Sequence, residues 1–402
     1  MSISIKKNEL LMQKRIDYTI FIIVIILSTI GLLMIYSTSD QDILIKQLIW
    51  LVISAIIALL FVRPQPRMWS SVAWILYLVT IVMLIAVFFV PGYPKNRFHI
   101  SDITLQPSEF AKLTVIIFAA MVLSSRKKLS KIQDIIVPLL IFLIPAILIF
   151  IEPDFGSSQI FIPIMIMMLY WAGMPFIKIF IFLSPILAAA LSFNIYVWVI
   201  YFAGLILLLY WQRQLFDLIY GVSSNFLIGL STPFIWNALK SYQRDRIISF
   251  FSPWVDPKGM SWQIIQSKIA IGSGGLIGKG FLSGTQKKLE FLPERHTDFI
   301  FSCLGEEFGL IGILIVTVLI FLLLYRLLLL ARESKNRFAS LVAAGVFAWV
   351  GYQSFLNIGM TMGLLPITGV TLPFISYGGS SMLALYAAIG ICLAISRTRF
   401  EY

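Results

Sequence analysis

Residues 20–36 have the sequence IFIIVIILSTIGLLMIY, and this stretch decides the fold. Apolar side chains occupy every face of the helix that it would form, whereas a helix on a soluble protein keeps one polar face. Residues 311–330 repeat the pattern, and runs of about 20 apolar residues are long enough to cross a bilayer. A membrane β-barrel would instead alternate apolar and polar side chains. The sequence therefore predicts an all-α, polytopic membrane protein.

The rest of the chain has the same character. Of its 402 residues, 59% are hydrophobic and 12% are charged, about half the charged share of a soluble domain. Twelve apolar runs predict about 10–12 transmembrane helices, at 17–37, 44–62, 68–90, 107–125, 134–151, 157–174, 175–193, 195–211, 215–239, 304–330, 338–359 and 377–396. Asn225, Gly229 and Pro233 interrupt the run at 215–239, so that segment either spans the membrane or is re-entrant.

Cysteine and histidine give no metal or disulfide signal. Cys303 and Cys392 lie in or beside apolar runs at no ligand spacing, and His99 and His296 are far apart in the sequence. Neither a disulfide framework nor a zinc site is supported. The partners expected of such a chain are membrane lipids and proteins, not nucleic acid.

Lysine and arginine predict the orientation, because cytoplasmic loops carry an excess of basic residues. With both termini in the cytoplasm, the inner segments carry eighteen Lys and Arg, and the short outer loops and helix ends carry four. The other nine lie in a long outer loop, 240–303, of the kind that the rule exempts. The predicted organisation is thus an N-terminal helical part, 1–239, this extracytoplasmic loop, and a C-terminal helical part, 304–402.

The long loop contains enough apolar side chains, including Trp254 and Trp262, to predict that it is folded. Its nine basic and five acidic residues suit an anionic substrate such as a phosphate-bearing lipid, and a solvated loop with scattered charges is the alternative.

The glycine-rich run 270–280 fails as a nucleotide motif, because Gly280 replaces the hydroxyl residue needed after Lys279. It is either a structural turn or a backbone that approaches an anion together with Lys268 and Lys279.

Charged residues near the membrane need a reason, because an ionised side chain at mid-bilayer costs on the order of 3 kcal/mol. Glu109 and Lys112 lie three residues apart on one helix face, after Pro107. They either neutralise each other to fix helix packing or line a polar cavity that opens outward. Asp154 lies at another outer helix junction, where it either faces the same cavity or caps the following helix.

Asp298 is the most suggestive carboxylate, because it lies where the basic outer loop re-enters the membrane. Partial burial there would raise its pKa and its basicity, as a general base requires. A helix cap is the alternative interpretation. On a continuous helix Glu306 would lie within about 80 degrees of the Asp298 face, and Glu307 would lie opposite.

Several long motifs occur in a fixed order along nearly the whole chain, and together they resemble the SEDS family (shape, elongation, division and sporulation). They are QPSEFAK at 106–112, EPDFG at 152–156, YQRDR at 242–246, QSKIAIGSGG at 266–275, the segment 284–299, NIGM at 357–360 and LPFISYGGSS at 372–381. The family has RodA, FtsW and SpoVE branches, and the sequences of these motifs are more similar to the RodA branch than to FtsW.

The resemblance implies a peptidoglycan glycosyltransferase that polymerises lipid II on the outer face of the bacterial cytoplasmic membrane, paired with a class B penicillin-binding transpeptidase. By motif, Asp298 matches the family's essential aspartate, and Glu109 with Lys112 matches the polar pair of its central cavity. The chain departs from the family pattern at Phe98, usually Trp, and at Glu152, usually Gln. The stretch 195–239 is expected to be an added helical pair in a family that typically has ten spans.

The substrate implied by the resemblance also implies the chemistry. An α-linked donor that gives a β-1,4 product inverts its anomeric centre, so one displacement assisted by one base suffices, and Asp298 is the candidate. A divalent cation or basic side chains would stabilise the departing pyrophosphate. The candidate substrate and cavity residues are Arg97, Lys112, Asp154, Arg244, Arg246, Lys268, Lys279 and, in the last motif, Ser376. A lipid II flippase and a non-catalytic scaffold for the transpeptidase are the alternative functions.

Overall fold

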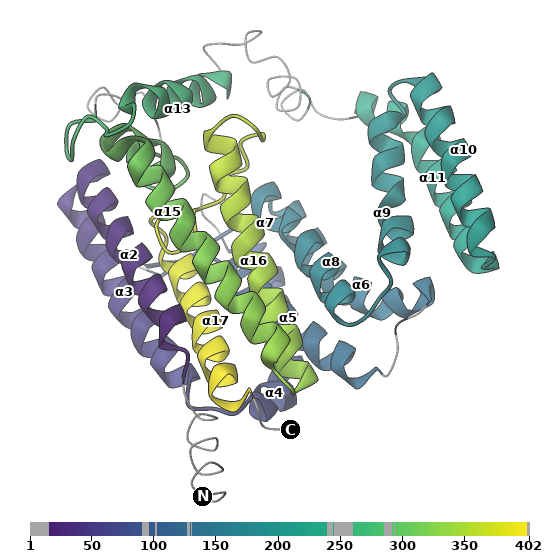
Figure 1. Ribbon diagram of the computed structural model, residues 1–402, viewed down its shortest axis with the longest axis horizontal. Helices are drawn as coiled ribbons and strands as arrows, with labels where there is room; N and C mark the ends of the chain where they lie inside the picture. The colour runs from purple at the N-terminus through teal and green to yellow at the C-terminus, as the bar shows by residue number, and fades with distance from the viewer. Residues whose placement is uncertain are drawn as a thin grey trace, which may run out of the picture.

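The computed structural model describes residues 16–90, 96–100, 103–126, 129, 131–238, 244, 260–284, 292 and 294–399. Figure 1 shows a bundle of long helices with a shorter helix, α13, across one end. The elements are α2 (Tyr18–Thr38), α3 (Gln41–Phe61), α4 (Pro66–Val87), β1 (Phe98–Ile100), β2 (Ile103–Leu105), α5 (Pro107–Ser125), η1 (Ile132–Ile135), α6 (Ile136–Ile151), α7 (Phe155–Gln159), α8 (Phe161–Trp171), α9 (Phe176–Leu191), α10 (Ile195–Gln212), α11 (Leu215–Ala238), α13 (Met260–Gly274), α15 (Ile300–Glu333), α16 (Arg337–Thr361) and α17 (Gly379–Thr398).

Each of the twelve predicted apolar runs coincides with helix. Among the described residues, ten helices are long and apolar enough to cross a membrane, and two shorter apolar segments, Phe155–Trp171 and Phe176–Leu191, accompany them. The prediction of a polytopic helical membrane protein is confirmed. The sequence did not predict the antiparallel hairpin of β1 and β2, in which Phe98 pairs with Leu105.

The centre of the bundle is formed by α5, α16 and α17, whose surfaces are mostly buried, whereas α3 and α4 turn most of their surface outward. Small residues let the central helices approach closely. A Cβ on Gly390 of α17 would lie 2.5 Å from the carbonyl oxygen of Ala58 on α3. The inner helices therefore form the rigid support for any site at the bundle's ends.

Helices α9, α10 and α11 form a group at one side of the bundle (Figure 1). Ile181, Leu205 and Leu209 make a hydrophobic cluster there, separate from the main core. The buried Lys178 and Asp217 side chains form an ion pair between α9 and α11. Pro233 lies within the last two turns of α11, which is one continuous helix from Leu215 to Ala238, so the structure does not show a re-entrant segment.

Helix α15 is kinked at Gly309, which has φ 63° and ψ −159°. The kink frees backbone groups, and the glycine-rich loop after α13 pairs with them. The amides of Lys279 and Gly280 donate to the carbonyls of Glu306 and Glu307, each at 3.0 Å. A Cβ on Gly278 would lie 2.1 Å from the Glu307 carbonyl oxygen. The glycines therefore allow the backbone of this loop to lie close to the backbone of α15. This contact agrees with the interpretation of the run as a structural turn.

The boundaries of the long outer loop stay a prediction, because much of 239–259 and 285–293 lies outside the described residues. The part that is described contains α13 and the turn 294–299, which leads into α15. Leu292 and Phe299 pack against Ala270 of α13 in a small hydrophobic cluster. This contact connects α13 to the segment that carries Asp298.

Candidate functional site

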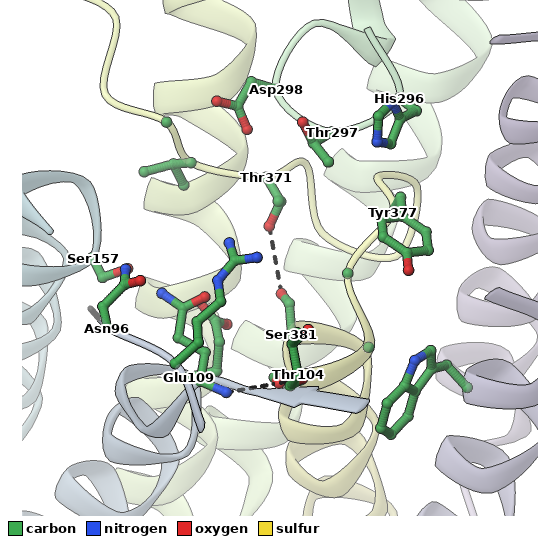
Figure 2. Close-up of a pocket in the computed structure, with 18 of the residues that line it drawn as sticks. Asn96, Thr104, Glu109, Ser157, His296, Thr297, Asp298, Thr371, Tyr377 and Ser381 are labelled. Atoms are coloured by element: carbon green, nitrogen blue, oxygen red, sulfur yellow. Dashed lines mark hydrogen bonds between the residues drawn. The ribbon is translucent and has the colours of Figure 1, made fainter. Parts of the chain in front are cut away.

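A cavity of about 810 Å³ lies between α3, α5, the β-hairpin, the turn 294–298 and the segment 369–381. Figure 2 shows its walls, with Asp298, Thr371, Ser381 and Glu109 among the labelled side chains. The volume is in the range of small-molecule sites. Five of the residues selected from the sequence line this one cavity: Arg97, Glu109, Lys112, Asp154 and Asp298.

The Glu109–Lys112 pair lies in the first two turns of α5, which Pro107 starts. Lys112 Nζ lies 2.7 Å from Glu109 Oε1, and the Lys112 side chain is 1% exposed. The ammonium group also lies 3.5 Å from Gln353 Oε1 and 5.4 Å from the centroid of the Trp349 ring. The pair is thus both neutralised and part of the cavity wall, so the two interpretations of the sequence are compatible.

Asp154 has two structural roles at once. Its Oδ1 accepts a hydrogen bond from the Ser157 amide at 3.0 Å and caps α7. Asp154 also lines the cavity, and its Oδ2 accepts a hydrogen bond from Gln106 Nε2 at 2.8 Å. The carboxylate is therefore held by neutral donors from two neighbouring segments. Capping and cavity lining, which were alternatives in the sequence, occur together.

Asp298 lies directly before the N-terminus of α15, with its carboxylate at the cavity wall (Figure 2). The pKa of Asp298 is raised from its ordinary value of 3.8 to about 7, mainly by burial in the surrounding protein and next by the nearby Glu294 carboxylate. A hydrogen bond from Thr297 and the positive charge of Arg97 lower it, and Asp154 acts in the raising direction. The balance leaves a carboxylate that titrates near neutral pH, which is where a general base works best.

Three other predicted residues, Lys279, Lys268 and Arg244, do not line the cavity. Lys279 Nζ lies 2.8 Å from Glu306 Oε1, beside the kink of α15. Lys268 is exposed on α13, with its chain against Gly363, and Arg244 donates to the Asn237 carbonyl. Arg246 lies outside the described residues.

Ser376 is buried behind the cavity wall. Its hydroxyl donates to the Thr297 carbonyl at 2.6 Å and accepts from the Leu372 amide at 2.8 Å.

Glu306 and Glu307 are also buried and do not line the cavity. Glu307 accepts a hydrogen bond from Ser37 on α2. The helical-wheel relation between Asp298 and Glu306 does not apply, because Asp298 lies in a turn before α15 and the two residues do not share one continuous helix.

Several cavity residues were not selected from the sequence. His296, Tyr377 and Ser381 lie inside the quoted motifs, and Trp50 lies on α3 with no sequence signal beyond its aromatic ring. Burial lowers the pKa of His296, which favours the neutral imidazole. Its ring packs edge to face on Tyr377, with centroids 5.6 Å apart.

The sequence left open a divalent cation as a stabiliser of the leaving group. Within the described ranges, no group of three or more His, Cys, Asp or Glu side chains is arranged to hold a metal ion. In the cavity, Glu109 is paired with Lys112 and Asp154 with amide donors. The cavity carboxylates that have such partners do not form a ready metal site.

The sequence comparisons place the chain among known proteins. The family model for the cell cycle proteins FtsW, RodA and SpoVE matches residues 17–401. The chain belongs to this family. The resemblance found in the motifs is therefore confirmed over nearly the whole length of the protein.

Three members of the FtsW/RodA/SpoVE family illustrate the similarity. Peptidoglycan glycosyltransferase MrdB of Escherichia coli (strain K12) is 34% identical, over 96% of this chain and 94% of the relative. Stage V sporulation protein E of Bacillus subtilis (strain 168) is 33% identical, over 95% and 97%. Peptidoglycan glycosyltransferase RodA of Treponema pallidum (strain Nichols) is 30% identical, over 94% and 97%.

Solved structures of the family share the fold. One is a chain in a study of a peptidoglycan synthase complex that coordinates polymerization and crosslinking. It has a TM-score of 0.74 at 28% identity and covers 96% of this chain and 99% of that chain. RodA of Thermus thermophilus has a TM-score of 0.65 at 24% identity, with the same coverage.

Proposed function

We propose that this protein is a peptidoglycan glycosyltransferase that polymerises lipid II into β-1,4 glycan strands during cell-wall elongation. Two full-length relatives carry the name peptidoglycan glycosyltransferase. The observation that carries the proposal is the shared cavity: Asp298, with a pKa near neutrality, lies in the same pocket as the Glu109–Lys112 pair and Arg97.

The reaction needs one base, which removes the proton of the attacking hydroxyl group. The acceptor's 4-hydroxyl attacks the anomeric carbon of the donor, a new glycosidic bond forms, and the bond to the pyrophosphate breaks with inversion. The hydroxyl proton passes to the Asp298 carboxylate, and the bond electrons leave with undecaprenyl pyrophosphate. A positioned base contributes roughly 10² to 10⁴ in rate. Asp298 is suited to this role because its pKa is about 7.

The departing pyrophosphate gains negative charge, which fixed cations stabilise when water is excluded. Of the basic residues proposed for this role, Arg97 and Lys112 line the cavity, and Lys46 on α3 lines it as well. Glu109 fixes the position of the Lys112 ammonium group through the 2.7 Å contact. Lys268 and Lys279 lie elsewhere, so they are weaker candidates for contact with the pyrophosphate.

The polyprenyl tails have a route that keeps them in the bilayer. Ile49 and Ile53 line the cavity and are 54% and 40% exposed, and they belong to α3, which turns most of its surface away from the bundle. An apolar wall continuous with the lipid face suits a substrate whose tail stays in hydrocarbon while its headgroup enters the cavity. Lipid-like density beside Ile49 in an experimental map is the expected observation.

We place the cavity on the outer side of the bacterial cytoplasmic membrane and both termini in the cytoplasm. The excess of basic residues in the inner loops supports this orientation. The start of α2 and the last turn of α17 lie together: the Asp17 amide donates to Ser396 Oγ at 3.1 Å, and Asp17 also pairs with Arg326. Labelling of single cysteines at Asp42 and Arg337 with a membrane-impermeant reagent tests it. Only the Asp42 position should react in intact cells.

A class B penicillin-binding transpeptidase is the proposed protein partner. The support is the similarity to a chain studied as part of a peptidoglycan synthase complex. Copurification of such a transpeptidase with the tagged protein from its own membranes is the expected result. Recovery of a division-specific transpeptidase instead would move the function from elongation to division.

The decisive experiment is polymerisation of lipid II by the purified protein in detergent. The wild type should form glycan polymer, Asp298→Asn should lose roughly 10² to 10⁴ in rate, and Asp42→Asn should retain full activity. Asp42 is the matched control because it is an exposed carboxylate at the start of α3 that does not line the cavity. Equal rates for Asp298→Asn and the wild type would refute the proposal.

The same experiment separates the alternatives. A flippase needs two compartments, so polymer formed in detergent by the purified protein cannot come from flipping. A scaffold would give no polymer on its own, and Asp298→Asn would then support normal cell shape. The polar cavity favours catalysis over transport, because its charged residues lie near the starts of α3, α5 and α15 and not along the middle of the helices.

A further inference from the structure

The backbone of the turn that carries Asp298 is held at three consecutive carbonyl groups. The Tyr377 amide donates to the His296 carbonyl at 2.9 Å, and Ser376 Oγ donates to the Thr297 carbonyl at 2.6 Å. Asn357 Nδ2 donates to the Asp298 carbonyl at 2.9 Å. These carbonyls lie before the start of α15 and need hydrogen-bond donors from elsewhere. Asn357 on α16 supplies one donor, and Ser376 and Tyr377, which precede α17, supply the other two.

Asn357 makes a second bond that connects two walls of the cavity. Its Nδ2 also donates to the Val370 carbonyl at 2.7 Å. The neighbouring Gly369 has φ 69°, and a Cβ there would lie 3.5 Å from Asp298 Oδ2. One amide group thus ties the Asp298 turn to the segment that faces its carboxylate, and both segments line the cavity.

The identity of the residue matches this role. Asparagine supplies two N–H donors from one atom, which two carbonyl oxygens need, whereas aspartate would present acceptors to acceptors. Asn357 is fully buried, and within the described part of the chain its Oδ1 has no hydrogen-bond partner. A buried acceptor without a partner is unfavourable, so the two bonds that Nδ2 donates are the contacts that account for an asparagine at this position.

We propose that Asn357 is a positioning residue for the general base: it fixes the backbone of Asp298 against the Val370 segment, so that the carboxylate faces the acceptor hydroxyl. This inference rests on the proposed glycosyl transfer and on the role of Asp298 within it. Asn357 lies behind the cavity wall and acts through Asp298, without contact to the substrate.

The test compares Asn357→Leu with Ser354→Ala on the same helix. Ser354 is buried and donates to the Val350 carbonyl within α16, and it does not line the cavity. Asn357→Leu should lower kcat for lipid II polymerisation at least tenfold and change KM by less than about twofold. Ser354→Ala should leave both constants unchanged.

The pH dependence supplies a readout that a general loss of stability would not move. With the turn released, the Asp298 carboxylate becomes more hydrated, so the midpoint of its titration should fall toward that of a free aspartate. Glu294, Arg97 and Asp154, the charged groups around it, are unchanged in the variant. Carbodiimide labelling of Asp298, followed by mass spectrometry across a pH series, measures the midpoint without requiring polymer formation.

Ser376→Ala provides a second arm if Asn357→Leu does not fold. It removes the donor to the Thr297 carbonyl and should shift the labelling midpoint in the same direction. A folded variant with a wild-type midpoint, or a shifted midpoint with wild-type kcat, overturns the inference. Failure of the wild-type protein to polymerise lipid II would instead refute the proposed function, and the labelling result would still decide whether Asn357 positions Asp298.

Discussion

The rate of glycan polymerisation is expected to rise with pH through neutrality, because Asp298 must be deprotonated to act as the base. Its pKa of about 7 implies that roughly one molecule in ten is active at pH 6 and roughly nine in ten at pH 8. Initial rates should therefore rise about tenfold over that interval. An aspartate with the ordinary pKa would be ionised throughout it and would give a flat profile.

Two neighbouring charges provide variants with opposite signs. Arg97 lowers the pKa of Asp298 and Glu294 raises it. Arg97→Gln should therefore move the midpoint of the pH profile upward, and Glu294→Gln should move it downward. Both side chains are exposed, so each shift should be less than about one pH unit and should shrink when salt is added.

The assay is the initial rate of polymer formation from labelled lipid II in detergent, between about pH 5.5 and pH 8.5. Each variant is measured at saturating substrate, since Arg97 lines the cavity and its loss should also weaken substrate binding. A flat profile for the wild type would refute the assignment of the base. Shifts of the same sign in Arg97→Gln and Glu294→Gln would refute the electrostatic account of its pKa.

Three further predictions concern stability. Burial and the Asp154 carboxylate raise the pKa of Glu152 from 4.5 to about 8, so the folded state loses stability relative to the unfolded state as pH rises from 4.5 to 8. Glu152→Gln should therefore raise the free energy of unfolding by on the order of 3 kcal/mol at pH 8 and hardly at all near pH 4.5, and a difference in thermal unfolding that does not widen with pH contradicts this. Gly278→Ala should reduce the folded yield in size-exclusion chromatography, because a Cβ there would meet the Glu307 carbonyl at 2.1 Å with φ at 89°, whereas Gly272→Ala has open space and should be neutral. Lys178→Met and Asp217→Asn should each cost about 3 to 5 kcal/mol by leaving one buried charge unpaired. The double variant should cost less than either single change, and additive losses in thermal unfolding would contradict the pairing.

The sequence predicted the helices well for a simple reason. A run such as 20–36 is apolar on every face, so no tertiary contact is needed to identify it. The β-hairpin and the kink at Gly309 were missed because both depend on pairing between segments. Phe98 pairs with Leu105, and the amides of Lys279 and Gly280 pair with the carbonyls of Glu306 and Glu307 on α15. Neither contact leaves a periodic pattern in the sequence.

The part of the site that could be predicted from the sequence consists of charged residues at the membrane boundary. Glu109, Lys112 and Asp298 were selected because charged residues at the membrane need a partner or a function, and they share one cavity. The basic residues of the outer loop could not be ranked, because sequence distance does not say which way a side chain turns. Lys279 pairs with Glu306, 27 residues away.

The α10–α11 hairpin has a consequence for how such a protein can change its number of crossings. The hairpin packs mainly on α9 and shares a hydrophobic cluster apart from the main core. A hairpin contributes two passages through the bilayer or none, so its gain or loss leaves the parity of the passages unchanged. The membrane-crossing helices that follow, α15, α16 and α17, and the pocket beside them would keep the same orientation in a shortened chain as in this one.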